Sequence, residues 1–495
     1  MERGAVTPPN VVVVVLDTLR ARNCSSYGHE RATTPVIDRL AEEGVRFSRA
    51  TTVSPWTLPS HASLFTGVPP TAHRTNSLES QLPESLSTVA TTLARAGYDT
   101  VGMSMNPWLS SLFGVTRGFE TFHNLQGPFA TDTYRQFTML ATDETRSVPQ
   151  RVAALVEEQS PGNLLRNCLT AAYRQVRSPD DDGAEQAISH AERVVRRSDQ
   201  YFLFLNLLEP HLPYDPPPSV RRTFVPESVS DERLDGLNQD SKAYNVRNVE
   251  MDDEEFDLLE RLYDAEIRYV DSQLASLLET IDEQGDRDET LLIVTSDHGE
   301  NIGDHGLMGH NYSVHQTLLE VPLVARFPDY FEGGRVEDGR VSTLDVPATI
   351  ADVLADYGVD TNEFGAQQRG RSLAEPVPMD RTVTAEYLNP VPSIDRLREA
   401  CEDPSFDVST YDRTMRTVLR ANWKFVTRSD GTRDLYDLAD DPGETTDVGD
   451  DSPDVRDSLS TVLREWTSAL ETAGEHRTGD VGESVEQRLE ELGYR

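Results

Sequence analysis

Two apolar runs rich in β-branched residues are each followed by side chains of types that can bind metal ions. Residues 11–16 (VVVVVL) are followed by Asp17, and residues 290–295 (TLLIVT) are followed by Ser296, Asp297 and His298. In open α/β sheets ligands collect at the carboxyl ends of the strands, so both runs would deliver these groups to one sheet edge. Two carboxylates and an imidazole suit a divalent cation. Each residue alone is more simply a helix cap or turn residue, and only the combination predicts a metal site.

The elements that must position these residues alternate between strands and helices. Continuous apolar runs predict buried strands, and segments with apolar residues at helical spacing separate them. The strands are expected at residues 11–16, 100–103, 201–208, 290–295 and 321–327, and the helices at 34–44, 87–97 and 257–283. This alternation predicts an α/β fold with a large, mostly parallel sheet between helices.

The chain is expected to divide into a catalytic α/β domain (8–380), a small antiparallel C-terminal subdomain (381–475) and a polar tail (476–495). Within the first, residues 126–199 carry no strand signal and are expected to form a helical insertion. Within the second, two short runs at 423–427 and 435–438 flank Ser429-Asp430-Gly431, which predicts a hairpin, and a helix is expected at 453–473.

One segment resembles a known catalytic motif. Residues 54–67 (SPWTLPSHASLFTG) are similar to the motif of the sulfatase family, in the alkaline phosphatase superfamily, in which a Cys or Ser nucleophile precedes x-Pro-Ser-Arg-Ala-Ser-Leu-x-Thr-Gly. Further blocks resemble the family's in order; they lie at 10–20, 34–47, 209–214, 263–271, 296–306 and 435–444. The resemblance implies the sulfatase-type α/β sandwich and hydrolysis of sulfate or phosphate esters.

Three positions depart from the family's motifs. The nucleophile position is Thr57, which should escape the oxidation that makes formylglycine from Cys or Ser, so no formylglycine is expected. The motif's arginine is His61, and the lysine that follows His-Gly-x-x-x in the family is His310. Relatives that transfer phosphoryl groups, including phosphodiesterases and phosphoglycerol transferases, do use threonine at this place.

The resemblance implies that Thr57 is a metal-activated nucleophile, with Asp17, Asp297 and His298 as the other protein ligands of one divalent ion. A hydroxyl becomes a competent nucleophile on a dication, and a helix start adds N–H donors. The ion would be Ca²⁺ if the site is sulfatase-like, with Mn²⁺, Mg²⁺ or Zn²⁺ as alternatives. Thr18 stands where sulfatases often carry a second acidic ligand, so a thinner coordination shell is expected.

Histidines are the expected donors to the tetrahedral anion. Three of them, His61, His211 and His310, align with substrate-binding positions of the family, although a histidine is more often structural. Two others in the same region are alternatives, namely His305 and His315. Asn106 precedes Pro107; it is an alternative pocket residue, but a turn residue before proline is the simpler interpretation.

Two classes of function remain open from the sequence. The first is an enzyme that cleaves a sulfate or phosphate ester of a small molecule or glycan through Thr57, with a phosphodiesterase or phosphoglycerol-type transferase as the variant that threonine favours. The second is an inert binder of a sulfated or phosphorylated glycan. The absence of a formylglycine precursor at position 57 would be expected in a family member that has lost its catalytic activity. Retention of Asp17, Asp297 and His298 favours the enzyme.

The composition excludes several partners. The chain of 495 residues carries 85 acidic and 46 basic residues, a net charge of −39, and its only lysines are Lys242 and Lys424. Such a surface repels nucleic acid and anionic membranes. An acidic, lysine-poor chain is typical of proteins from salt-accumulating microbes, in which molar salt screens the repulsion, and an ordinary acidic protein is the alternative.

Cellular location is predicted from the cysteines and the N-terminus. Cys24, Cys168 and Cys401 are too few for a disulfide framework, which favours a reducing cytoplasm. No signal region is visible at the N-terminus, and no run of eighteen apolar residues predicts a membrane span. The sequence says nothing about oligomeric state.

Overall fold

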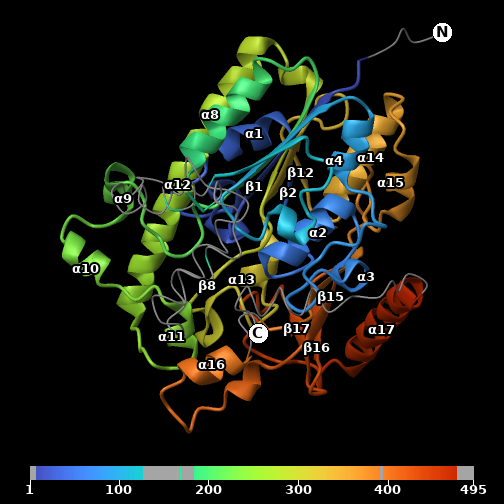
Figure 1. Cartoon of the computed structure of the whole chain (residues 1–495). Helices are drawn as coiled ribbons and strands as arrows, with labels where there is room; N and C mark the ends of the chain where they lie inside the picture. Colours follow the sequence, from blue (N-terminus) through green and yellow to red (C-terminus); the bar gives the residue numbers. More distant parts are fainter. Residues whose placement is uncertain are drawn as a thin grey trace.

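The computed structural model describes residues 7–125, 183–390 and 394–475, together with positions 155, 164, 165 and 168. An eight-stranded sheet runs through its centre (Figure 1). From edge to edge its strands are β12 (Arg335–Glu337), β2 (Val45–Phe47), β11 (Leu323–Arg326), β7 (Thr290–Thr295), β1 (Asn10–Leu16), β6 (Tyr201–Leu207), β4 (Asp99–Ser104) and β5 (Thr121–Asn124).

The three central strands are buried along their whole length. β1 pairs in parallel with β6 on one side and β7 on the other. Alternate residues of β1 enter different cores: Val11, Val13 and Val15 pack in one, and Val12, Val14 and Leu16 in the other. Both faces of the sheet are therefore covered by apolar side chains, and this is why the strand reads as an unbroken β-branched run.

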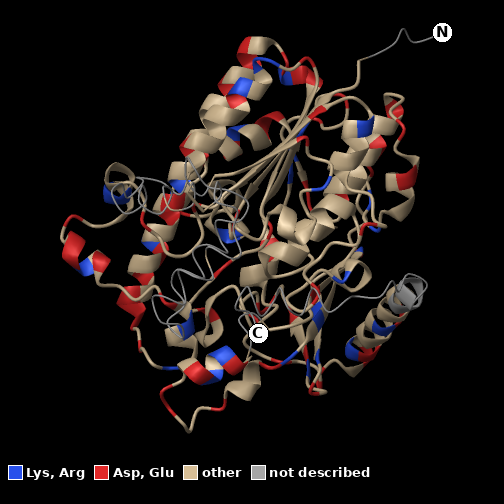
Figure 2. Cartoon of the chain, in the orientation of Figure 1, with Lys and Arg blue, Asp and Glu red and all other residues tan. Residues whose placement is uncertain are grey.

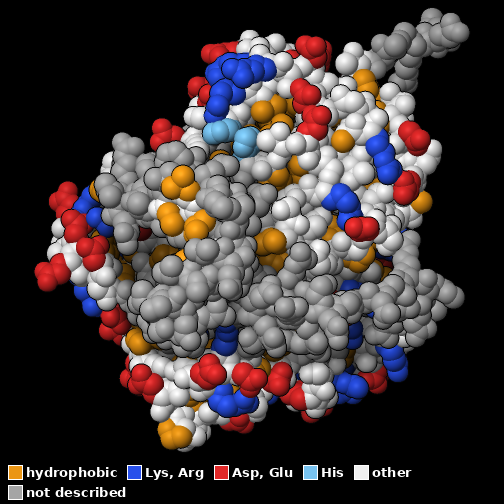
Figure 3. Space-filling model, in the orientation of Figure 1, with side chains coloured by type: hydrophobic (Ala, Val, Ile, Leu, Met, Phe, Trp, Pro, Cys, Tyr) orange, Lys and Arg blue, Asp and Glu red, His pale blue; other side chains and the backbone are white. Residues whose placement is uncertain are grey.

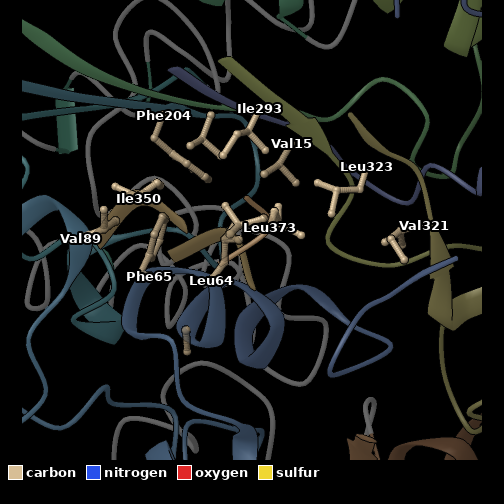
Figure 4. Packing of buried hydrophobic residues seen from close by; sticks show 14 of the residues in the cluster. Val15, Leu64, Phe65, Val89, Phe204, Ile293, Val321, Leu323, Ile350 and Leu373 are labelled. Atoms are coloured by element: carbon tan, nitrogen blue, oxygen red, sulfur yellow. The ribbon is translucent and has the colours of Figure 1, made fainter. Parts of the chain in front are cut away.

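Helices form the two outer layers (Figure 1). On one face lie α2 (Thr57–Thr66), α4 (Val89–Arg95) and α14 (Asp345–Asp356); on the other lie α1 (Pro35–Glu43), α8 (Ala184–Val195) and α12 (Asp253–Gln284). Figure 4 shows the first core, in which Leu64 and Phe65 of α2 face Val15 and Ile293 of the sheet. The shorter helices are α3 (Pro70–His73), α9 (Pro218–Phe224), α10 (Asp231–Asp235), α11 (Ser241–Asn245), α13 (Gln316–Leu319), α15 (Asn362–Gln367) and α16 (Ile394–Ala400).

The long helix α12 has clear start and stop signals. The Asp252 side chain accepts from the Glu255 backbone N–H, and the Glu255 side chain returns the contact, which completes a capping box. Gly285 ends the helix with a φ of 81°, a conformation that glycine adopts without a steric penalty. The helix predicted for residues 257–283 is confirmed, with one more turn at its N-terminal end.

The strand predicted for residues 321–327 is wrong in its extent. Pro322 has no N–H to donate, and the segment splits there into β10 (Glu320–Val321) and β11. β10 joins a small sheet with β3 (Ala50–Thr51) and β13 (Val341–Ser342), whereas β11 runs antiparallel to both β7 and β2. The other neighbouring strands of the large sheet pair in parallel, so it is mixed but mostly parallel.

The C-terminal segment forms a second, antiparallel sheet. Its order is β14 (Thr382–Tyr387), β15 (Met415–Arg420), β16 (Trp423–Arg428) and β17 (Arg433–Asp437), and helix α17 (Pro453–Glu475) packs on it. The hairpin predicted around Ser429-Asp430-Gly431 is β16–β17. Of the insertion predicted at 126–199, the structure describes α8 and its flanking residues, whereas most of the rest, like the tail at 476–495, lies outside the described residues.

Acidic side chains cover the outside of the described part of the molecule. Figure 2 shows them on the ends and outer faces of the helices, and the space-filling view in Figure 3 shows them along the left and lower margins, interspersed with basic side chains. No helix among the described residues is long and apolar enough to cross a membrane. The cytoplasmic location stays a prediction.

Candidate active site

Two buried carboxylates face each other across the carboxyl ends of β1 and β7. Asp17 and Asp297 are 0% and 1% exposed. Asp297 Oδ1 accepts the backbone N–H groups of Thr18, at 3.3 Å, and His298, at 3.0 Å. One oxygen of each carboxylate, Asp17 Oδ1 and Asp297 Oδ2, is buried without a hydrogen-bond partner among the described residues. Burying a carboxylate oxygen without a hydrogen-bond donor costs free energy, and a cation bound between the two oxygens would offset that cost.

His298 presents one ring nitrogen to the same place. Its Nδ1 lies 2.9 Å from the carbonyl of Gly299, which only accepts, so Nδ1 carries the proton and Nε2 carries the lone pair. Nε2 lies 3.4 Å from Asp297 Oδ2 and 4.0 Å from Asp17 Oδ1. Ligand atoms of Asp17, Asp297 and His298 all lie within 4.8 Å of one another, a spacing at which one ion can contact all three.

The electrostatics of this cluster favour a dication. Burial first, and then the charge of Asp17, raises the pKa of Asp297 well above its usual range. Burial lowers the pKa of His298, which keeps the imidazole neutral as a metal ligand must be. The orphaned oxygens and the neutral nitrogen fit a divalent ion with mixed oxygen and nitrogen ligands.

Thr57 stands at the first position of α2, directly beside this cluster. Its Oγ1 lies 3.3 Å from His298 Nε2, and the N-cap Trp56 gives the helix no side-chain cap. Ser60 in the first turn donates to the Asp297 carbonyl at 2.7 Å, as does Thr52 at 2.5 Å. The motif thus fixes the helix start to the end of β7, and uncapped N–H groups and the helix dipole favour negative charge at that start.

Two asparagines also belong to the site, although the sequence favoured a turn role for Asn106 and gave no role to Asn206. Asn106 Nδ2 donates to Asp17 Oδ2 at 2.9 Å and to Thr57 Oγ1 at 3.2 Å, and Asn206 Nδ2 donates to the same oxygen of Asp17 at 3.1 Å. Asn106 also forms the predicted turn, because its Oδ1 accepts the N–H of Trp108. The available signal was Asn206 itself, a polar residue inside the buried strand β6.

His61 is buried beside Asp297 and Thr57. Its Nδ1 is 2.9 Å from the Thr57 carbonyl and 3.5 Å from Asp297 Oδ2, and the ring packs edge-on against Phe204. The side chain is fully buried, and burial lowers its pKa to about 4. His61 thus contacts the Thr57 carbonyl, and its buried Nε2 has no hydrogen-bond partner among the described residues, so its role as a donor to the anion stays a prediction.

His211 and His310 form a group of imidazole rings with His298. Their ring centroids are 5.0 Å apart, and His310 is 4.6 Å from His298. His310 Nδ1 contacts Oε1 of the buried Glu300 at 3.2 Å. Burial alone would lower the pKa of His310, but the Glu300 carboxylate outweighs it and raises that pKa. The structure therefore brings two of the three predicted histidines into one cluster and adds Glu300 to it.

The alternative histidines lie elsewhere. His305 and His315 stack on each other, and His315 Nδ1 is 3.6 Å from Oε2 of Glu444, in the C-terminal segment. Within the described residues, neither contacts Thr57 or the carboxylate pair. They are therefore poor candidates for donors to the anion at Thr57.

Comparisons with known proteins agree with this architecture. The sequence model of the family described as Sulfatase matches residues 9–357. The choline-sulfatase of Rhizobium meliloti is 25% identical over 462 residues, 89% of this chain and 82% of that enzyme. The phosphonate monoester hydrolase of Agrobacterium radiobacter has a TM-score of 0.64 at 21% identity, over 93% of this chain and 96% of that one. A structure solved with its substrate D-glucosamine-2-N,6-O-disulfate has a TM-score of 0.66 at 17% identity, over 94% of this chain and 99% of that one.

Proposed function

The chain belongs to the sulfatase family and is a sulfuric or phosphoric ester hydrolase, and on this premise we propose that it works through a covalent ester on Thr57. The observation that carries the proposal is the position of Thr57 Oγ1, 3.3 Å from His298 Nε2, beside two carboxylate oxygens without partners. Asp17, Asp297 and His298 would hold a divalent ion there, with Thr57 as a further ligand. When bound, the ion supplies Lewis-acid stabilisation of an alkoxide and of the developing anion.

We assign the chemical steps of the reaction to individual side chains of the site. Thr57 loses its hydroxyl proton to water, Oγ1 attacks the sulfur or phosphorus, and the bond from that atom to the leaving oxygen breaks. Asn106 Nδ2 donates to Thr57 Oγ1 and steadies its negative charge. Glu300 fixes Nδ1 of His310, so the other ring nitrogen of His310 can give a proton to the leaving oxygen. Water or an alcohol then gives a proton to His310 and attacks the central atom, and the bond from that atom to Thr57 Oγ1 breaks.

Threonine favours a phosphoryl substrate within this scheme. A formylglycine hydrate can expel sulfate by collapsing to an aldehyde, whereas a threonine ester has no such exit and must be attacked at sulfur or phosphorus. The second step is therefore the difficult one, and we assign its support to the His211–His310 pair, whose ring centroids lie 5.0 Å apart. A phosphodiesterase or a phosphoglycerol-type transferase is the second candidate function. A sulfated or phosphorylated small molecule or glycan is the proposed substrate class.

We expect phosphodiester or phosphonate monoester substrates to be cleaved faster than the matching sulfate monoester. The measurement is kcat/KM for a panel of nitrophenyl esters that share one leaving group, assayed with several divalent metals in molar KCl. Mass spectrometry of the same preparation must show unmodified Thr57. Two successive displacements would retain configuration in any transfer product at phosphorus. A higher kcat/KM for the sulfate ester would contradict the preference for phosphoryl substrates. It would not contradict the proposed covalent ester on Thr57.

The inert-binder alternative makes an opposite prediction for the same panel. Retention of the unpartnered oxygens of Asp17 and Asp297 supports the enzyme, because a binding protein gains nothing from two buried carboxylates that repel each other. Bound metal together with release of nitrophenol from any ester would exclude the inert binder.

We also propose that the acidic surface is an adaptation to high salt. Repulsion among 85 acidic side chains acts over ~30 Å at 0.01 M salt and over only ~3 Å at 1 M salt. The thermal unfolding midpoint is therefore expected to rise steeply between low and molar KCl. A sucrose series of equal osmolarity is the control, because sucrose screens no charge. A midpoint that does not change with KCl would contradict this interpretation.

A further inference from the structure

A second group of metal-ligating side chains lies outside the candidate active site. His305 belongs to the short helical turn Asp304–Gly306, His315 precedes α13, and Glu444 follows β17 in the C-terminal segment. Ligand atoms of the three residues all lie within 4.8 Å of one another, as in the catalytic cluster. Segments more than a hundred residues apart in sequence therefore deliver two imidazoles and a carboxylate to one point.

Neighbouring side chains and the backbone fix the Glu444 carboxylate in place. Burial alone would raise the pKa of Glu444, but Lys424, 2.5 Å from Oε1, outweighs it and lowers that pKa to about 2. Oε2 faces His315 and accepts the backbone N–H of Gln316 at 2.6 Å. Burial and then the neighbouring His315 lower the pKa of His305 to about 4. The group thus offers one carboxylate oxygen and two imidazole rings within reach of one point, and these are donor types that bind metal ions.

The backbone holds two of these residues in an unusual conformation. His305 and Glu444 have φ values of 56° and 52°, in the left-handed region that non-glycine residues rarely adopt. No hydrogen bond joins a ring nitrogen of His305 to another described residue, so side-chain hydrogen bonding does not account for its conformation. Strained backbone of this kind is concentrated at binding sites, where it positions a side chain.

We propose that His305, His315 and Glu444 bind a second divalent ion, of the Zn²⁺ class, separately from the catalytic ion. Two imidazoles with one carboxylate are a common zinc donor set, whereas Ca²⁺ and Mg²⁺ prefer oxygen ligands throughout. The rings stack at 3.5 Å with an interplanar angle of 8°, so one of them must rotate to aim both lone pairs at one ion. His305, which is exposed, has room to do so. The charge of Lys424 is expected to make this site the weaker of the two.

The surroundings leave the ion accessible. His305 lines two cavities, of about 770 Å³ and 520 Å³; the first is also lined by His315 and the second by Glu444. An ion held by three protein ligands would have a coordination position free for water on the cavity side. Bound there, it would tie the segment that follows His298 to the C-terminal segment that carries Glu444.

The number of Zn²⁺ ions bound per chain tests the proposal. Equilibrium dialysis of the full chain in molar KCl is expected to give two ions for the parent and one for His305→Ala. The His315→Ala variant should also bind one ion, and the pair together keep the test valid if one of them fails to fold. His190→Ala is the matched control, because His190 forms a similar ring pair with His123, at 4.9 Å, but belongs to no metal-ligating cluster among the described residues.

The outcome separates this site from the catalytic one. Asp297→Asn is expected to lose the catalytic ion and to keep the one at His305. If the parent and both histidine variants bind equal numbers of ions, the second site is overturned, whatever Asp297→Asn does. If Asp297→Asn binds as many ions as the parent while His305→Ala binds one fewer, the second site stands and the catalytic metal site fails.

Discussion

Thr57→Ala is expected to lower kcat/KM by at least about 10³-fold, which corresponds to a loss of about 4 kcal/mol of transition-state stabilisation. The substitution removes Oγ1, which lies 3.3 Å from His298 Nε2 and accepts from Asn106 at 3.2 Å. Without it no covalent ester forms, and only direct attack by water remains. The rest of the site should stay in place, because α2 is held by Ser60 and its apolar face rather than by Thr57.

Two further variants make the measurement interpretable. Thr57→Ser keeps the hydroxyl and should retain much of the activity, although it loses the methyl group that limits side-chain rotation. Thr66→Ala, at the other end of the same helix, removes a hydroxyl that bonds only to the Ala62 carbonyl among the described residues, so its kcat/KM should stay within a few-fold of the parent. If Thr57→Ala were as active as the parent, water would be the nucleophile and the covalent mechanism would be wrong.

The sequence predicted those parts of the fold whose signals are local. The run at β1 and the apolar spacing in α12 each identify their element, because full burial and a one-sided helix leave clear patterns. Strands such as β2 and β12, of three residues each, escaped prediction because their pairing is decided by distant segments. The antiparallel direction of β11 was equally invisible, since it depends on which strands lie beside it and not on its own residues.

Only part of the candidate site could likewise be predicted from the sequence. The sequence indicated Asp17, Asp297 and His298 because strand ends meet at one sheet edge, and the structure brings their ligand atoms together. Asn106 could not be placed because its Asn-Pro sequence also describes an ordinary turn. The position of His61 was likewise out of reach, because only the packing of Phe204 against its ring shows that it faces the core.

Asp297→Asn is expected to abolish metal retention and activity together. The asparagine Oδ1 can still accept the N–H groups of Thr18 and His298, while its NH₂ takes the place of the unpartnered Oδ2. The change therefore removes a ligand and its charge but keeps the local hydrogen bonds. Losing only a hydrogen-bond partner of a ligand weakens metal binding by about 10–100-fold, so losing the ligand itself should cost at least that much. The rate should fall by at least about 10³-fold, as for Thr57→Ala.

The stability of the same variant separates a metal site from a structural carboxylate pair. In chelator, Asp297→Asn should unfold at the same temperature as the parent or a higher one, because the substitution removes a carboxylate whose pKa is raised first by burial and then by repulsion from Asp17. Asp271→Asn is the control for metal retention and rate: this buried carboxylate accepts the N–H groups of Val36 and Ile37 at the start of α1, and burial raises its pKa to about 7. It should keep the metal and the rate. Full activity of Asp297→Asn after chelation would show that no ion between β1 and β7 takes part in the reaction.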